Sequence, residues 1–122
     1  MTKPTIAPEA SATIFHITTK KDWEKARPAG ALIPASLAAT GYLHASLKHQ
    51  VLPVANSVFR GKKGLLLLEI DATKLKSEVK MEDLRRSGAP YPHIYGGIIC
   101  SAVVAVHPFE PKADGTFEWP KT

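Results

Sequence analysis

The spacing of apolar residues along the chain predicts a domain built mainly of short strands. Residues 13–18 are β-branched or aromatic apart from His16, and alternation places Phe15 and Ile17 together on one face of that strand. Residues 65–70 form a nearly continuous apolar run, which predicts a strand buried on both faces. The other predicted strands are 42–46, 77–83, 102–106 and, in the tail, 116–119.

Helical spacing and helix-boundary residues predict two helices between these strands. Thr19 and Asp22 resemble a capping box that opens the first helix, and Gly30 follows its end. The second helix is predicted over 47–59, where apolar residues recur at helical spacing, and the proline inside it is expected to kink or delay it. A single helical turn is expected at 34–38.

This order of elements predicts the fold class and the domain limits. Helices and strands in mixed order indicate an α+β fold rather than a doubly wound parallel sheet. A chain of 122 residues has the size of one domain, which we place over 13–122. Residues 1–12 lack the apolar segment of a secretory signal and are rich in Pro, Ala, Ser and Thr, so they are predicted to be a disordered lead-in.

Composition adds expectations about partners and compartment. The net charge of +5 and the pI of about 9.4 favour nucleotides, RNA or other small anionic ligands as partners, although the basic residues are scattered. The single cysteine, Cys100, excludes an internal disulfide and indicates a reducing, cytoplasmic location. No apolar run approaches the ~20 residues that cross a bilayer, so we expect no membrane association, and we expect a monomer.

Two histidines lie on strands that run into helices. His16 shares a strand face with Thr18, and His44 shares one with Tyr42 and Ser46, so both histidines are predicted to face a cleft or solvent. The free N–H groups at a helix N-terminus make such junctions suitable for an anion. The sequence therefore predicts a histidine-lined ligand site at these strand ends.

A third histidine and one acid are the remaining candidates for proton transfer. His93 and Tyr95 lie in the segment 91–97, which contains a proline and ends in two glycines, and this segment is predicted to be a loop that holds functional side chains. Glu82 would serve as a general acid or base if its surroundings raised its pKa.

Other kinds of site find no support, and a structural interpretation of the histidines stays open. The motifs GxGxxG, GxxxxGK, HExxH and CxxC are absent. No metal site is predicted, because the histidines lack the short spacing of metal ligands. A histidine within an apolar strand is often only packed and hydrogen-bonded. This interpretation stays open for His16, His44 and His93, and it is favoured for His49 and His107.

A series of short motifs runs through almost the whole ordered part of the chain. They are 14–19, a helix bearing Trp23, 41–46, 54–56, 67–71, 82–83, 92–96 and 102–106. In combination they resemble one bacterial family, the domain of unknown function 952 family (DUF952). That family has no assigned activity, so the resemblance implies kinship without a function.

The first half of the chain also resembles the ADP-ribosyltransferase superfamily, and within it the RNA 2′-phosphotransferases. A strand with a histidine, a helix with Trp23, a glycine and a strand ending in His-x-Ser carry this resemblance. It implies split antiparallel β-sheets with a nucleotide between them. It also implies that His16 holds a ribose hydroxyl of NAD, with His44 and Ser46 lining the neighbouring part of the pocket. Ile17 stands where glycine is usual after that histidine.

The leading hypothesis is an ADP-ribosyltransferase-like enzyme with NAD as its substrate. His16 and His44 orient the ribose, and either His93 or Glu82 transfers a proton. Two alternatives stay open: a non-catalytic module that binds a nucleotide, an RNA end or a small anion, and a partner-binding protein whose histidines are only packed. The predicted ligand-binding residues are Thr18, Ser46, Tyr95 and Trp23.

Overall fold

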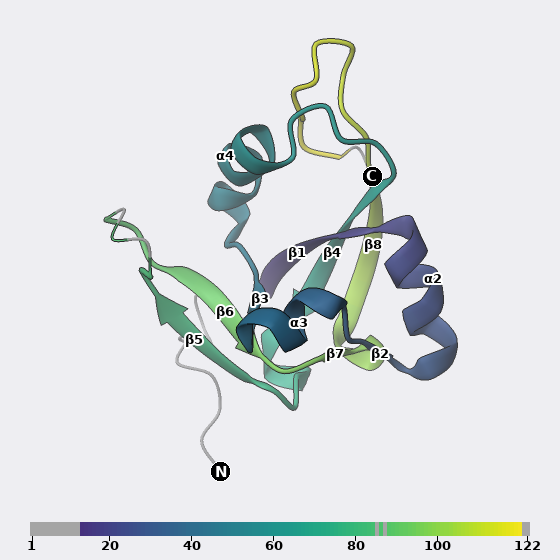
Figure 1. Cartoon of the computed structure of the whole chain (residues 1–122), viewed down its shortest axis with the longest axis vertical. Coiled ribbons are helices and arrows are strands. Elements are labelled where there is room, and N and C mark those ends of the chain that lie inside the picture. Colours follow the sequence, from purple (N-terminus) through teal and green to yellow (C-terminus); the bar gives the residue numbers. More distant parts are fainter. Residues whose placement is uncertain (1–12, 85, 87, 121–122) are drawn as a thin grey trace.

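Three helices and several antiparallel sheets make up the described part of the chain, which confirms the predicted α+β class (Figure 1). The computed structural model describes residues 13–84, 86 and 88–120, so the predicted lead-in over 1–12 lies outside the described residues. In chain order the elements are β1 (Thr13–Thr19), α2 (Lys20–Ala29), β2 (Ala31–Leu32), α3 (Ala35–Thr40), β3 (Leu43–His44), α4 (Lys48–Val58), β4 (Leu65–Asp71), a 3-10 turn (Ala72–Lys74), β5 (Glu78–Glu82), β6 (Tyr91–Tyr95), β7 (Ile98–Ile99), a 3-10 turn (Cys100–Ala102) and β8 (Val103–Phe109).

The strands form two three-stranded antiparallel sheets and one two-stranded ribbon. The first sheet has the order β1-β4-β8, the second has the order β3-β6-β5, and β2 pairs with β7. The two larger sheets are joined at one bridge, where Phe15 and Ser46 exchange both backbone N–H to C=O hydrogen bonds at 2.8 Å. Beyond this bridge the sheets separate, so the outer edge of β1 faces the space between them (Figure 1).

Local residues explain where the helices begin and end. Thr19 Oγ1 accepts a hydrogen bond from the backbone N–H of Asp22 at 3.0 Å, which is the predicted N-cap of α2. Gly30 ends this helix with a φ of 85°, a conformation that glycine adopts without strain. Pro53 lies inside α4, which nevertheless begins at Lys48, so the proline does not delay the helix.

The segment 91–97, predicted as a loop, is mainly strand β6, and this prediction was wrong. β6 is the central strand of its sheet, paired with β3 and β5, and these long-range pairs decide its conformation. Pro92 is tolerated there because the N–H and C=O of a strand residue point to the same edge. Its C=O accepts from Ala45, just past the end of β3, so no ladder bond to β5 is lost.

The C-terminal part also departs from the prediction. β8 continues past the expected limit to Phe109, through Pro108, which is possible because β8 is an edge strand. The tail 116–119 forms no strand. Instead, Phe117 donates its backbone N–H to the side-chain oxygen of Asn56 on α4 at 2.6 Å and stacks on Phe109 with ring centroids 4.7 Å apart.

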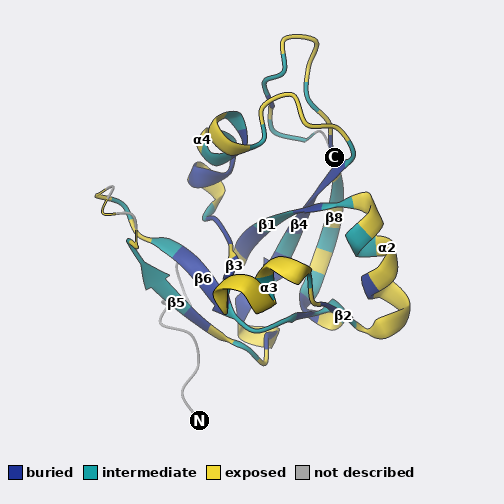
Figure 2. Ribbon diagram, in the orientation of Figure 1, coloured by how far each residue is buried: buried dark blue, intermediate teal, exposed yellow. Residues whose placement is uncertain are grey.

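Two hydrophobic clusters form the core against which the sheets and helices pack. β1 belongs to both, because Ile14 packs into one cluster and Phe15 into the other. Ile14 therefore lies in the core, whereas His16 and Thr18 on the same face of β1 line a cavity. Figure 2 shows burial concentrated on β1, β4 and β6, while α3 is mostly exposed. No helix among the described residues has the length and apolar content to cross a membrane.

Candidate functional site

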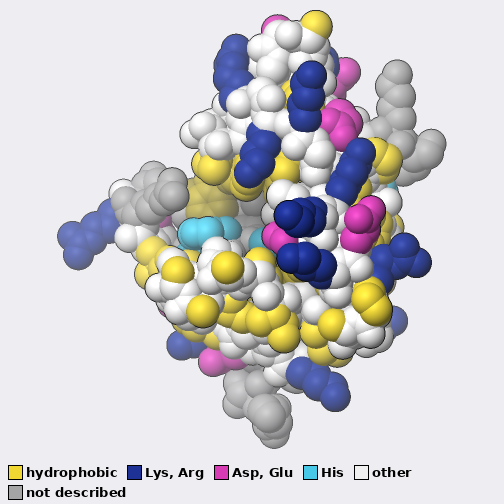
Figure 3. Space-filling view, turned by 45° about the vertical axis from the view of Figure 1, so that its right-hand side comes forward, with side chains coloured by type: hydrophobic (Ala, Val, Ile, Leu, Met, Phe, Trp, Pro, Cys, Tyr) yellow, Lys and Arg dark blue, Asp and Glu magenta, His cyan; other side chains and the backbone are white. Residues whose placement is uncertain are grey.

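A cavity of about 640 Å³ opens between the two larger sheets, along the unpaired edge of β1. Small-molecule sites span roughly 300–1,000 Å³, so the volume suits a ligand of nucleotide size. Figure 3 shows this hollow with histidine side chains on its floor and Lys and Arg side chains along one rim. Its walls come from β1, α3, α4, the β3 segment, the end of β5 with the start of the β5–β6 connection, and β6.

Six of the eight predicted site residues line this cavity. They are His16, Thr18, His44, Ser46, Glu82 and His93. The other two do not line it: Trp23 packs against the main core from α2, and the hydroxyl of Tyr95 is bonded to Glu82. Because these six come from four separate segments, their convergence depends on long-range pairing of strands.

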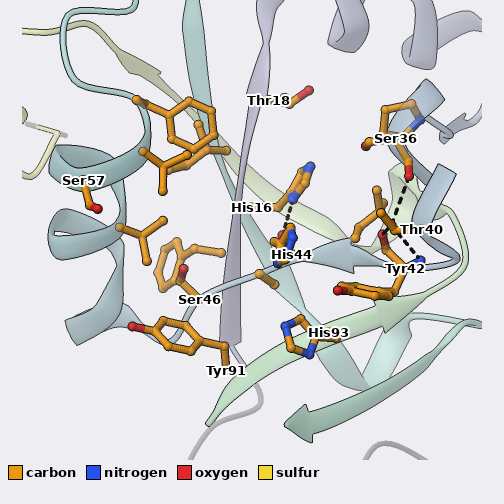
Figure 4. A pocket seen from close by; sticks show the side chains of 18 of the residues that line it. His16, Thr18, Ser36, Thr40, Tyr42, His44, Ser46, Ser57, Tyr91 and His93 are labelled. Atoms are coloured by element: carbon orange, nitrogen blue, oxygen red, sulfur yellow. Dashed lines mark hydrogen bonds between the residues drawn. The ribbon is translucent and has the colours of Figure 1, made fainter. Parts of the chain in front are cut away.

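The protonation of His16 is determined by its surroundings. Its Nδ1 lies 2.6 Å from the backbone oxygen of His44, and a carbonyl oxygen only accepts, so Nδ1 carries the hydrogen. Burial lowers the pKa of His16 below 6.5, and the bond to His44 offsets this effect only in part. At neutral pH the ring is therefore neutral and Nε2 is an acceptor. Figure 4 shows the second ring nitrogen of His16 pointing away from His44, into the cavity.

One face of the second sheet carries the remaining aromatic and histidine side chains. His44 and His93 are direct cross-strand partners, with ring centroids 5.4 Å apart. Tyr42 packs against both, at 5.3 Å from the His44 ring and 4.9 Å from the His93 ring. Strand alternation causes this, because the intervening Leu43 and Ile94 point into the core on the opposite face.

Glu82 connects this face to β5 through two hydrogen bonds. Its Oε1 lies 3.1 Å from Nδ1 of His93 and accepts from the hydroxyl of Tyr95 at 2.6 Å. The bond from Tyr95, followed by that from His93, lowers the pKa of Glu82. The sequence hypothesis required a raised pKa for Glu82 to act as an acid or base, and the structure shows the opposite direction. Glu82 is an ionised acceptor at neutral pH.

The hydrogen bond from the Tyr95 hydroxyl to Glu82 can be tested through the ionisation of Tyr95. Donation to Glu82 raises the pKa of Tyr95 from 10.0 to about 12. In an alkaline titration followed by tyrosine absorbance, we expect a high-pH step that is lost in Tyr95→Phe. Glu82→Gln should move this step back toward 10.0, because the negative partner is gone. A high-pH step that survives in Tyr95→Phe would contradict the bond.

The cavity has an apolar side and a polar side. α4 and its neighbours supply the apolar side, and Figure 4 shows hydrophobic side chains grouped next to this helix. Ser36, Thr40 and Tyr42 lie on the opposite side of His16 from α4, where the Thr40 hydroxyl is hydrogen-bonded to the backbone oxygens of Ser36 and Tyr42. The apolar lining residues include Phe15, Ile17, Val54, Val58, Phe59 and Leu65. Sequence analysis missed Ser36 and Thr40, because α3 meets the cavity only through the tertiary fold.

The charged residues of the lining are few and mostly acidic. The described lining residues include one lysine, Lys62, no arginine and three carboxylates, those of Asp22, Glu82 and Asp83. The cavity itself is therefore not built around a strongly anionic group. Within the described residues, no group of three or more His, Cys, Asp or Glu side chains is placed to hold a metal ion.

The two histidines for which a structural role was favoured lie outside the cavity. His49 is exposed on α4. His107 on β8 lies 3.1 Å from Glu69 on β4, through its Nε2 and the Oε1 of the acid. Neither residue lines the cavity. The described residues thus contain two His–Glu pairs with equal nitrogen-to-oxygen distances, of which one lines the cavity.

Comparison with known proteins identifies a family but does not assign an activity. The model of a family described as a protein of unknown function, DUF952, matches residues 17–106. The crystal structure of protein CC0527 from Caulobacter crescentus is similar, with 31% identity, a TM-score of 0.78, and coverage of 87% of this chain and 93% of that one. The solution structure of CC0527 has 28% identity and a TM-score of 0.68, covering 86% of this chain and 90% of that one. No curated protein matches the chain. Because the family model covers well over half of it, the chain belongs to the DUF952 family.

Proposed function

We propose that the cavity binds a nucleotide of the NAD or ADP-ribose type, and that the protein is an ADP-ribosyltransferase-like enzyme. The observation that carries this proposal is the oriented acceptor of His16. Its Nδ1 is held by the carbonyl of His44, and its Nε2 points into a cavity of nucleotide size. A ribose hydroxyl is a neutral donor that such a nitrogen can bind, whereas a phosphate oxygen could not donate to it.

The edge of β1 supports the same ligand. Phe15 directs its N–H and C=O outward to Ser46, and in an antiparallel strand the residue two positions later points the same way. Ile17 therefore presents one donor and one acceptor to the cavity, which match the amide of a nicotinamide group. The Ile17 side chain packs against the second core cluster, so it leaves this backbone edge accessible.

The two sides of the cavity also fit a nucleotide. A planar ring is accommodated on the apolar side at α4, next to Val54 and Val58, and a ribose on the hydroxyl-rich side at His16. Among the described lining residues, Lys62 is a cation that can bind the phosphates. This division of the lining supports binding of the sugar through polar groups and of the ring through apolar side chains.

One observation favours a second function, binding without catalysis. The lining contains three carboxylates and one lysine within the described residues, and no arginine grips a phosphate. Enzymes that stabilise charge on phosphates or on a leaving group use preorganised cations or donors for this purpose. A pocket that only holds a nucleoside or an ADP-ribose group needs fewer of them.

The experiment that tests the proposal is an NMR titration of the labelled protein with NAD, ADP-ribose and a 2′-phosphorylated ribonucleotide, observing the five histidine rings. We expect ligand-dependent shifts at His16, His44 and His93, and none at His49 or His107, which lie outside the cavity. Release of nicotinamide from NAD would distinguish the enzyme from the binding module. Unchanged spectra at millimolar ligand would rule out the nucleotide.

A further inference from the structure

We propose that His93 is the general base of this cavity, acting on a hydroxyl group of the acceptor substrate, and that Glu82 is its positioning residue. The identity of the donor, NAD, rests on the proposed function. The assignment of the proton-transferring residue rests on the hydrogen bonds of β5 and β6 alone. It separates two residues, Glu82 and His93, that the sequence left as equivalent candidates.

In His93, Nδ1 is hydrogen-bonded to Glu82, and Nε2 is the nitrogen that would take up the proton. Nδ1 lies 3.1 Å from the carboxylate of Glu82, and because a carboxylate only accepts, Nδ1 carries the hydrogen. The neutral ring therefore has its lone pair on Nε2. The His93 side chain is nearly buried, at 5% exposure, yet it lines the cavity. In Figure 4 its ring lies between Tyr91 and Tyr42, beside His44.

The hydrogen bonds that Glu82 accepts make it a weaker base than a free carboxylate. Oε1 of Glu82 already accepts from the Tyr95 hydroxyl at 2.6 Å in addition to its contact with His93. Lys80 Nζ lies 4.9 Å from the centre of the Tyr95 ring and adds positive charge nearby. The bound carboxylate stabilises the imidazolium that forms when Nε2 takes up a proton, in the way that an acid orients the histidine of a catalytic triad.

His16 is suited to a different task. Its Nδ1 is bound to a neutral carbonyl, that of His44, and burial outweighs the groups that favour its charged form, so its pKa is lowered. His16 therefore remains an acceptor for a ribose hydroxyl. The cavity thus contains two histidines with their Nδ1 atoms committed to different partners, one for binding and one for proton transfer.

The proposed step transfers the ADP-ribose group from nicotinamide to the oxygen of the acceptor. Nε2 of His93 takes the proton of the acceptor hydroxyl, and the oxygen forms a bond to the ribose carbon that carries nicotinamide. The bond between that carbon and the nicotinamide nitrogen breaks, and its electron pair stays with nicotinamide, which leaves as a neutral molecule. The proton passes from His93 to water. With water as the acceptor, the products are ADP-ribose, nicotinamide and a proton.

The chain supplies a matched control, the pair of His107 and Glu69. Its nitrogen-to-oxygen distance is 3.1 Å, the same as in the pair of His93 and Glu82. It lies on β8 and β4 and does not line the cavity. If an acid partner alone determined the effect of a histidine, substitutions in the two pairs would change kcat equally. A difference in kcat between variants of the two pairs therefore measures the contribution of the position in the cavity.

The test compares His93→Gln and Glu82→Gln with His107→Gln and Glu69→Gln in the full chain, using NAD as the probe. We expect the first two variants to lower kcat for nicotinamide release by about 100-fold or more, as for loss of general-base catalysis. Their affinity for ADP-ribose should stay near that of the wild type, and both control variants should keep kcat. Equal rates in all variants would overturn the proposal, as would a wild-type protein that binds ADP-ribose but releases no nicotinamide.

A second measurement decides the question if the proposed function fails, that is, if ADP-ribose does not bind. Long-range proton–nitrogen NMR spectra of the free protein report which ring nitrogen of His93 carries the hydrogen. We expect Nδ1–H with unprotonated Nε2 in the wild type, and a changed tautomer distribution in Glu82→Gln. A hydrogen found on Nε2 in the neutral wild-type ring would remove the base from the cavity and overturn the assignment.

Discussion

Replacing Ile94 with alanine is expected to lower the free energy of unfolding by about 2–5 kcal/mol. Ile94 is 0% exposed in the main core cluster and lies on β6 between His93 and Tyr95, with its side chain on the opposite face. It pairs with Leu43 on β3 and Val79 on β5, both of them buried. Shortening the side chain loses contacts with both neighbours, and the surrounding strands can close the resulting gap only in part.

Chemical denaturation measures this effect, with Val104→Ala as the matched control. Val104 is also a β-branched residue on a strand, but it is 53% exposed on β8, so its truncation should change the unfolding free energy by less than about 0.5 kcal/mol. Similar losses in the two variants would show that β6 is not a central core strand. That outcome would also remove the support on which His93 and Tyr95 depend.

The elements that the sequence predicted best are those whose causes are local. The cap at Thr19, the left-handed glycine at Gly30 and the apolar run 65–70 each appear where expected. β6 was missed because Pro92 and the glycines after it are local turn signals, while its strand conformation comes from pairing with β3 and β5. Periodicity does not contain this information, since the partners of β6 lie elsewhere in the chain.

The candidate site shows the same division between local and distant causes. Alternation correctly placed His44 and Tyr42 on one face. The direction of the pKa shift of Glu82 could not be predicted, because its main cause is a hydrogen bond from Tyr95, thirteen residues away. Trp23 was expected beside the ligand, whereas the structure packs it against the core from α2. A ligand-binding role for Trp23 therefore has no geometric support.

His16→Asn is expected to lower the affinity for ADP-ribose by about 10- to 100-fold, the loss that follows when a buried hydrogen-bond partner is removed. The asparagine amide can still donate to the His44 carbonyl in place of Nδ1, so the side-chain hydrogen bond from β1 to the β3 backbone is preserved. No acceptor remains at the position of Nε2. His16→Gln places an oxygen closer to that position and should lose less affinity. His49→Asn, exposed on α4, is the control for the substitution itself.

The pH dependence of ADP-ribose binding tests the role of His16 as an acceptor in a second, independent way. Because burial lowers the pKa of His16 below 6.5, Nε2 is unprotonated at pH 7 and binding is intact there. As the pH falls through that lowered pKa, Nε2 gains a hydrogen and can no longer accept from a hydroxyl, so affinity falls by up to about tenfold per pH unit. Stability follows the same direction, since the unfolded chain binds the proton more readily and the contribution of neutral His16 is lost on acidification.

Calorimetric titrations with ADP-ribose should show this decline in affinity on acidification in the wild type and not in His16→Asn. An affinity that rises on acidification would indicate that His16 binds a phosphate as an imidazolium, and the ribose assignment would then be wrong.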